Sequence, residues 1–186
     1  MALTIRPLVP GDEPALRRLC LETTPLRARQ EVERFVILQT FCMYYLEREL
    51  SHCFAAEEEG GELRAALLCA PDFTAYERRF VQSVQPKFAP YGMHATANAR
   101  QVALLHRNAA GQYPAHCVPM FSEGLPGAAI TTLFEAMQTH LEGLGCRGVC
   151  AFTAKKQYAL RETLENLGFE AISRRNGIDT LGKIFD

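Results

Sequence analysis

Two neighbouring side chains near the middle of the chain could carry out proton transfer or nucleophilic attack. His116 and Cys117 lie in the apolar run Ala115–Phe121. A histidine titrates near neutral pH and could act as a general base, although a hydrogen-bonded core histidine is the alternative interpretation. A cysteine could act as a nucleophile, but the sequence shows no His/Asp arrangement that would activate Cys117.

Further polar side chains follow a second apolar run, Gly148–Thr153. Tyr158 lies close enough to the end of this run to act as a proton donor, and a half-buried tyrosine on a helix is the alternative. Lys155 and Lys156 could pair with phosphate charge or form a solvated basic turn. These three residues are therefore candidates for chemistry beside the second run.

The segment between the two runs has the layout of an anion-binding turn. Ser122–Gly127 is rich in turn formers. Apolar residues then recur every three or four positions, which predicts a helix over 128–144 with a stripe formed by Ile130, Leu133, Phe134, Met137 and Leu141. A strand and turn that lead into a helix N-terminus can hold phosphate groups, because free N–H groups and the helix dipole favour anions there.

Alternating apolar residues and turn signals predict the elements that position these residues. We expect strands over 3–8, 52–56, 63–70, 115–121, 148–153, 170–175 and 178–185. We expect helices from Asp12, which would cap the first one, to a break at Thr23, and over about 29–50, 73–88, 98–106, 128–144 and 157–166. Glu57–Glu59 is expected in a solvated hairpin turn, with a general-base role as the alternative. No repeat or linker interrupts the chain, so 1–186 is expected to be a single domain.

Composition narrows the classes of function. A net charge of −1 gives no general attraction to nucleic acid or to anionic membranes. The apolar run Ala65–Ala70 is too short to span a bilayer, and Met1–Arg6 lacks the layout of a signal peptide. The seven cysteines include no C-x-x-C pair, so we expect reduced core thiols, a cytoplasmic location and no metal site.

The order of elements resembles the GNAT family of acetyl-CoA-dependent N-acetyltransferases. Leu3–Pro7 with Gly11–Leu16 looks like the family's first strand and helix, and Leu167–Glu170 looks like its Gly-Phe segment before the sixth strand. Four shorter pieces resemble a bacterial subgroup similar to the acetyltransferase-like domain of some N-acetylglucosaminidases: Cys20–Thr23, Tyr44–Glu47, His52–Phe54 and Tyr113–His116. The resemblance implies an α/β (α+β) fold with a mixed, mostly antiparallel twisted sheet of six to seven strands flanked by helices.

The resemblance also implies a mechanism with acetyl-CoA as co-substrate. The strands 115–121 and 148–153 would splay apart, the pantetheine arm would lie along the first of them, and the following turn would hold the pyrophosphate. An amine of a small molecule or peptide would attack the thioester, with His116 and Tyr158 as candidate base and acid. The cofactor-binding positions implied are Val118, Met120, Phe121, Leu125, Gly127, Ala128, Ala129, Ile130 and Gln157.

Several positions depart from the family's pattern. Its phosphate turn reads Gln/Arg-x-x-Gly-x-Gly/Ala, and this chain places Leu125, Ala128 and Ile130 at the three defined positions. Pro126 within this turn has no N–H to donate, and its alternative role is that of a first-turn proline that starts the helix. A shift of one residue would bring Gly124 and Gly127 into the turn instead.

Two further departures concern catalysis. Leu164 occupies the position of the family's proton-donating tyrosine, and Pro119 occupies a strand position that is acidic in the subgroup. Pro119 indicates either a bulge or the edge of the splayed gap. The alternative to an N-acetyltransferase is therefore a catalytically degenerate GNAT module, acting as an acyl-CoA-binding regulator or a scaffold. A homodimer through the last strands is also an expectation from the resemblance.

Overall fold

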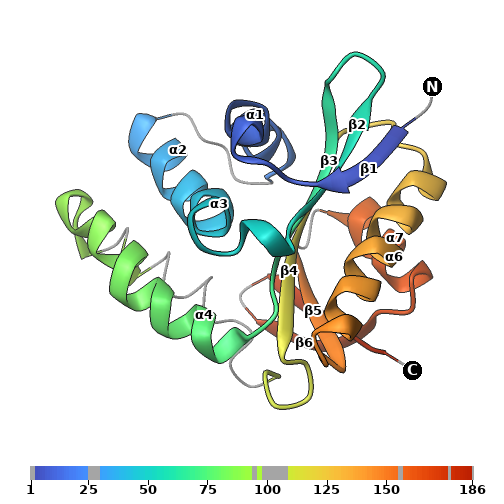
Figure 1. Ribbon diagram of the computed structural model, residues 1–186. Coiled ribbons are helices and arrows are strands. Elements are labelled where there is room, and N and C mark those ends of the chain that lie inside the picture. Colours follow the sequence, from blue (N-terminus) through green and yellow to red (C-terminus); the bar gives the residue numbers. More distant parts are fainter. Residues whose placement is uncertain are drawn as a thin grey trace.

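The computed structural model describes residues 3–24, 30–93, 96–97, 109–154, 157–175 and 177–185. These residues form one seven-stranded sheet in the order β1-β2-β3-β4-β5-β7-β6 (Figure 1). Its strands are β1 Leu3–Pro7, β2 Phe54–Glu58, β3 Leu63–Ala70, β4 Ala115–Phe121, β5 Gly148–Ala154, β6 Glu170–Arg175 and β7 Ile178–Ile184. Within the described ranges β4 and β5 pair in parallel and the other neighbours pair antiparallel. The mixed, mostly antiparallel sheet predicted from the sequence is thus confirmed.

Helices cover both faces of the sheet (Figure 1). One face carries α1 Glu13–Thr23, α2 Glu31–Leu38, α3 Tyr44–Arg48 and α4 Phe73–Arg79. The opposite face carries α6 Gly127–Gly143 and α7 Tyr158–Asn166. A π-helical segment, Gln39–Met43, joins α2 to α3, and α4 continues through a second one, Phe80–Val84, into the 3₁₀ helix Gln85–Tyr91. Shorter 3₁₀ turns lie at Pro10–Asp12 and Leu50–His52.

The hydrophobic core has two parts because successive strand residues point to opposite faces. In β3, Leu68 packs under α1, α3 and α4, whereas Leu67 packs under α6 and α7. The apolar stripe predicted for the 128–144 helix is buried in full against the second face: Ile130, Leu133, Phe134, Met137 and Leu141. β3 and β4 therefore lie in the middle of the molecule, covered on both faces.

Three sequence predictions need correction. Asp12 does not cap α1 with its carboxylate, which instead accepts hydrogen bonds from the Arg6 guanidinium and the Val9 N–H. His52 lies in a 3₁₀ turn, so the strand expected over 52–56 begins at Phe54. The helix expected over 29–50 is interrupted by the π-helical segment and ends at Arg48.

The expectation of a solvated turn over Glu57–Glu59 holds for Glu59, which is exposed in the turn, and is wrong for the two glutamates before it. Glu57 and Glu58 lie in β2, where Glu57 pairs with Arg6 and Glu58 pairs with Arg64. The pairing brings together residues that are distant in the sequence, so the neutralised charges could not be recognised from the local pattern.

Two other predictions fall where the structure describes nothing: the helix over 98–106, and Lys155 with Lys156. Within the described ranges, none of the helices has the length and apolar character needed to cross a membrane.

Candidate functional site

A gap opens in the sheet between β4 and β5. In the described part of the chain the two strands pair at three positions, and the last pair is Cys117 with Ala151. β4 continues to Phe121 and stays paired with β3 from His116 to Phe121. The end of β4 therefore has a strand partner on one side and none on the other among the described residues, as the resemblance to the GNAT family implied.

Pro119 lies at the edge of this gap. The pairing of β3 and β4 continues without a bulge, so of the two alternatives for Pro119 the bulge is wrong. The N–H of Ser122 donates to the Arg64 carbonyl at 2.9 Å. Backbone groups alternate in direction along a strand. The N–H groups of the even-numbered residues of β4 therefore point to β3, and the backbone groups of Pro119 and Phe121 point toward the gap. Proline thus stands at a position where no β3 hydrogen bond is lost.

The gap leads into the exposed N-terminus of α6. Pro126 is the N-cap residue, and its carbonyl accepts hydrogen bonds from Ala129 and Ile130 at 3.0 and 3.3 Å. The N–H groups of Gly127 and Ala128 precede these and belong to the helix end that lacks intrahelical carbonyl partners. No side chain among the described residues caps this end, and the first turn holds no acidic residue. The helix end is therefore suited to an anion.

The two bulky residues of this turn point away from that position. Ile130 is buried in the core beneath α6, and Leu125 packs against the same core. The bulk expected to reduce access at Ile130 is thus directed toward the sheet. Leu125 still supplies no charge where the family has glutamine or arginine. Gly124 adopts a positive φ of 77°, which glycine tolerates and which turns the chain toward the helix.

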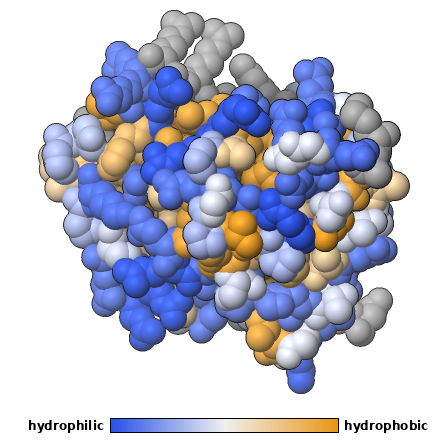
Figure 2. Space-filling model, turned by 45° about the horizontal axis from the view of Figure 1, so that its top comes forward, coloured by the Kyte–Doolittle hydropathy of each residue, from blue (hydrophilic) through white to orange (hydrophobic). Residues whose placement is uncertain are grey.

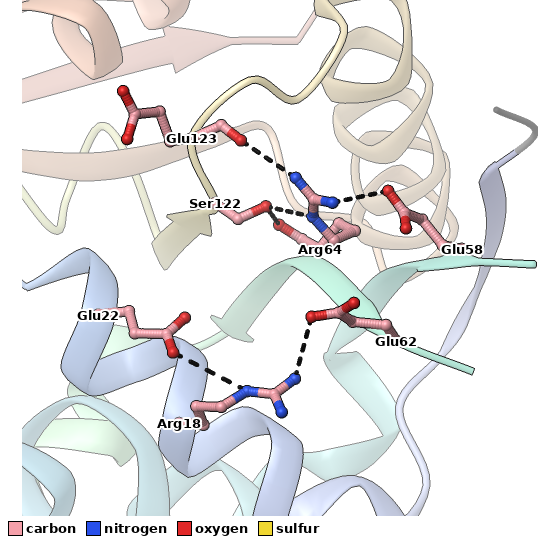
Figure 3. A network of polar contacts seen from close by, with 7 residues as sticks. All are labelled: Arg18, Glu22, Glu58, Glu62, Arg64, Ser122 and Glu123. Atoms are coloured by element: carbon pink, nitrogen blue, oxygen red, sulfur yellow. Dashed lines mark hydrogen bonds and ion pairs between the residues drawn. The ribbon is translucent and has the colours of Figure 1, made fainter. Parts of the chain in front are cut away.

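Arg64 of β3 fastens the beginning of the same turn (Figure 3). Its Nε donates to Ser122 Oγ at 2.8 Å, and its Nη2 donates to the Glu123 carbonyl at 3.1 Å. Its Nη1 donates to Glu58 Oε1 at 2.8 Å. The Ser122 hydroxyl in turn donates to the Arg64 carbonyl at 2.8 Å. Sequence reasoning missed Arg64, because its link to the turn depends on the register of β3 against β4.

His116 is enclosed on the other side of β4, at 1% exposure. Its Nε2 lies 2.7 Å from the Tyr45 hydroxyl in a hydrogen bond, and the rings of Tyr76 and Phe73 pack around it with centroids 4.2 and 5.4 Å away. Burial lowers the pKa of His116 to about 3. The imidazole is therefore neutral at pH 7, and the hydrogen-bonded core environment considered in the sequence is the one observed.

Gln157 and Tyr158 lie at the start of α7. Gln157 Oε1 accepts from the Ala154 N–H at 2.8 Å, and its Nε2 donates to the Thr23 carbonyl at 3.3 Å. Gln157 thus links the end of β5 to the end of α1. Tyr158 is the first residue of α7 and is 69% exposed. The structure does not place the Tyr158 ring against His116, since one is exposed and the other enclosed.

A buried hydroxyl on β5 was not selected from the sequence. Thr153 is 1% exposed, and its Oγ1 has no hydrogen-bond partner among the described residues. Extending the register of Cys117 with Ala151 by two residues puts Thr153 at the level of Pro119, across the gap. The sequence did not single out Thr153 because a threonine in an apolar strand carries no local pattern that marks a buried, unpaired hydroxyl.

Leu164, at the family's tyrosine position, is fully buried in the core.

No protein-family model matches the chain, and no curated protein sequence matches it. Solved structures do match over nearly the whole length. The structure of SsHAT superposes with a TM-score of 0.85 at 19% identity, covering 99% of this chain and 98% of that one. The polyamine N-acetyltransferase of Drosophila melanogaster gives 0.67 at 14% identity, with 99% and 100% covered. The PaiA N-acetyltransferase of Thermoplasma acidophilum, solved with coenzyme A, gives 0.60 at 12% identity and full coverage of both chains.

At these identities the comparison shows the fold. The seven-stranded mixed sheet with helices on both faces is the GNAT fold, as the order of elements in the sequence predicted. The parallel pair β4–β5 separates after Cys117, which leaves backbone groups of β4 without a β5 partner in the described part of the chain.

Proposed function

We propose that the protein transfers an acetyl group from acetyl-CoA to an amine of a small molecule or peptide. The observation that carries the proposal is the continuity of two features. β4 loses its β5 partner after Cys117, and the same strand then leads into the exposed first turn of α6. Unpaired backbone groups of a strand can bind an extended arm, and the helix end can bind the anion at the end of that arm.

The dimensions agree with this arrangement. Ser122 is five positions beyond Cys117, which in a strand corresponds to about 16 Å. An extended pantetheine arm has a length of the same order. With its pyrophosphate at the N–H groups of Gly127 and Ala128, its thioester would lie near the point where β4 and β5 meet. The acceptor amine would then approach from the face that carries α1 to α4.

Proton transfer is the least assisted step in this site. The amine nitrogen must bond to the thioester carbon, the carbon–sulfur bond must break, and one amine proton must leave. We assign His116 as the candidate acceptor, reached through Tyr45, and Tyr158 as the candidate donor to the thiolate. Since the pKa of His116 is lowered to about 3, it is a weak base, and the rate should rise with the fraction of neutral amine.

Two observations favour a second candidate function, an acyl-CoA-binding module without transferase activity. Leu164 is buried in the core at the position of the family's proton donor. His116 is enclosed by aromatic rings and has a pKa far below neutrality. Neither observation bears on cofactor binding, because both concern proton transfer.

A binding measurement followed by a turnover measurement separates the candidates. If acetyl-CoA binds with a micromolar constant, a millimolar concentration should raise the melting temperature by about 8–16 °C. Release of free thiol in the presence of amines would then establish transfer. Binding without thiol release would favour the module, and the absence of any melting shift would exclude both uses of CoA.

A further inference from the structure

Hydropathy does not mark a second binding site on the face of the molecule that Figure 2 shows. There, hydrophilic side chains divide the apolar side chains of the described residues into small areas. A broad apolar area would indicate a docking surface for another protein, and this view shows none among those residues. Polar side chains that meet between two elements are therefore the more informative feature.

Two histidines meet where the last turn of α6 packs against a 3₁₀ turn. His52 is the last residue of the 3₁₀ turn Leu50–His52, and His140 lies in the last turn of α6. The Nδ1 of His52 and the Nε2 of His140 lie 2.8 Å apart in a hydrogen bond. The ring of Phe54 packs against His140 with a centroid distance of 5.5 Å. Both histidines are half-buried, so the pair is partly open to solvent.

The hydrogen bond between the rings shows what chemistry the pair can carry. A bond between two ring nitrogens needs one N–H donor and one nitrogen lone pair, so at least one of the rings is neutral. If the donor ring changes tautomer, its proton moves through water to its other ring nitrogen. Two lone pairs then converge on one point, which is the arrangement that a metal ion requires of two imidazole ligands.

Only a small movement would admit a metal ion between the rings. Metal–nitrogen bonds of about 2.0–2.1 Å with octahedral or tetrahedral angles would hold the two nitrogens about 3.0–3.4 Å apart. The observed separation is 2.8 Å. Within the described residues no third histidine, cysteine, aspartate or glutamate joins the pair, so water would occupy the remaining coordination positions.

The position of His140 on α6 also favours a cation. A helix C-terminus carries partial negative charge from the carbonyl groups that lack intrahelical partners. His140 is 13 positions beyond Gly127, which along a helix is about 20 Å. An ion at this end would therefore lie well away from the end of α6 that is proposed to bind the pyrophosphate of CoA.

We propose that His52 and His140 form a binding site for a divalent transition-metal ion that prefers imidazole nitrogen, such as Zn²⁺ or Ni²⁺. The ion would bond to Nδ1 of His52 and Nε2 of His140, and it would tie α6 to the turn that leads into β2. The inference is independent of the proposed acetyl transfer.

The sequence gave no indication of this site. The expectation of no metal site was based on the spacing of the cysteines, and the two histidines are 88 residues apart. Only the packing of α6 on the 3₁₀ turn brings them together.

Titration calorimetry of the full chain with nickel chloride at pH 7.5 tests the proposal. We expect one Ni²⁺ ion to bind per chain, and Mg²⁺, which prefers oxygen ligands, not to bind. His52→Gln and His140→Gln should each weaken Ni²⁺ binding by about tenfold or more, because the loss of even an outer partner of a metal ligand costs about that much. His106→Gln removes an imidazole elsewhere in the sequence and should leave the binding unchanged.

A spectroscopic measurement identifies the ligand atoms even if a variant fails to fold. In ¹H–¹⁵N spectra of the wild-type chain with labelled histidines, Zn²⁺ should shift Nδ1 of one ring and Nε2 of another. Ni²⁺ should also raise the melting temperature of the wild-type chain and not that of His140→Gln. Equal binding of Ni²⁺ to these two chains would mean an adventitious ion only, and the absence of binding to the wild-type chain would likewise refute the site.

Discussion

Substitution of Arg64 by methionine should weaken the binding of acetyl-CoA without unfolding the sheet. The change keeps the length of the stem. It removes the hydrogen bonds to Ser122 Oγ and to the Glu123 carbonyl, and with them the ion pair to Glu58, which lies outside the turn. A single hydrogen bond of this kind contributes about 1 kcal/mol net. Losing both would therefore destabilise the ordered conformation at the start of the β4–α6 turn by about 2 kcal/mol. The ligand would have to supply this free energy to restore the ordered conformation on binding.

The expected effect on affinity follows from this figure. A cost of about 2 kcal/mol corresponds to a dissociation constant roughly 30-fold higher. Titration calorimetry with acetyl-CoA, or with free CoA, measures it.

The chain offers a matched control for this experiment. Arg18→Met breaks the ion pair with Glu62 and so releases the β2–β3 hairpin from α1 (Figure 3). Unlike Arg64, Arg18 makes no contact with the β4–α6 turn among the described residues. CoA affinity should be unchanged in this variant. Glu58→Gln removes a negative charge beside Arg64 while keeping an oxygen acceptor, so CoA should bind at least as tightly as before. The reasoning is refuted if Arg64→Met binds CoA normally, or if Arg18→Met is impaired to the same degree.

Three further predictions follow from single residues. Ala128→Asp places a carboxylate in the first turn of α6. The free energy of unfolding in urea should therefore rise by about 0.3–1 kcal/mol, whereas calorimetry should show weaker CoA binding. A rise in both the stability and the affinity for CoA would contradict the anion site. Burial lowers the pKa of His116 to about 3, so the unfolded chain binds more protons as the pH falls through its ordinary pKa of about 6.5. The free energy of unfolding should therefore fall by about 1.6 kcal/mol from pH 6.5 to pH 5. His116→Gln should lose that part of the pH dependence in urea titrations, while the lowered pKa of His52 leaves a smaller acid sensitivity in both chains. Thr153→Val should lower kcat more than it changes the KM for acetyl-CoA, and Thr153→Ser should restore the rate; identical kinetics in all three chains would show that the hydroxyl faces away from the gap.

Local patterns in the sequence were sufficient for most of the fold. The prediction for β3 agrees at both ends, and the stripe of α6 is buried as its spacing required. Both depend on neighbours within one element, where side-chain periodicity alone decides which face is buried. The π-helical Gln39–Met43 was not predictable in this way, because its apolar pattern is also that of a regular helix.

The candidate site was predictable in position and less so in chemistry. The turn Ser122–Gly127 and the end of β4 were found from turn formers and from the family resemblance. The weak basicity of His116 depends on Tyr45 and Tyr76, which are far away in the sequence and reach it through α3 and α4. The contacts of Arg64 likewise depend on which elements pack together. Long-range pairing therefore sets the electrostatics of this site, and no local pattern records it.

Pro119 has a consequence for the protein before any ligand is bound. Separating β4 from β5 creates two strand edges inside the sheet, and an unpaired strand edge can pair with a strand from another chain. Pro119 presents no N–H on the open side of β4, two residues beyond the last pair with β5. A foreign strand would therefore lose a hydrogen bond at the level where it would have to begin pairing. The residue that reduces the number of donors for a ligand thus also weakens the pairing of any foreign strand at this edge.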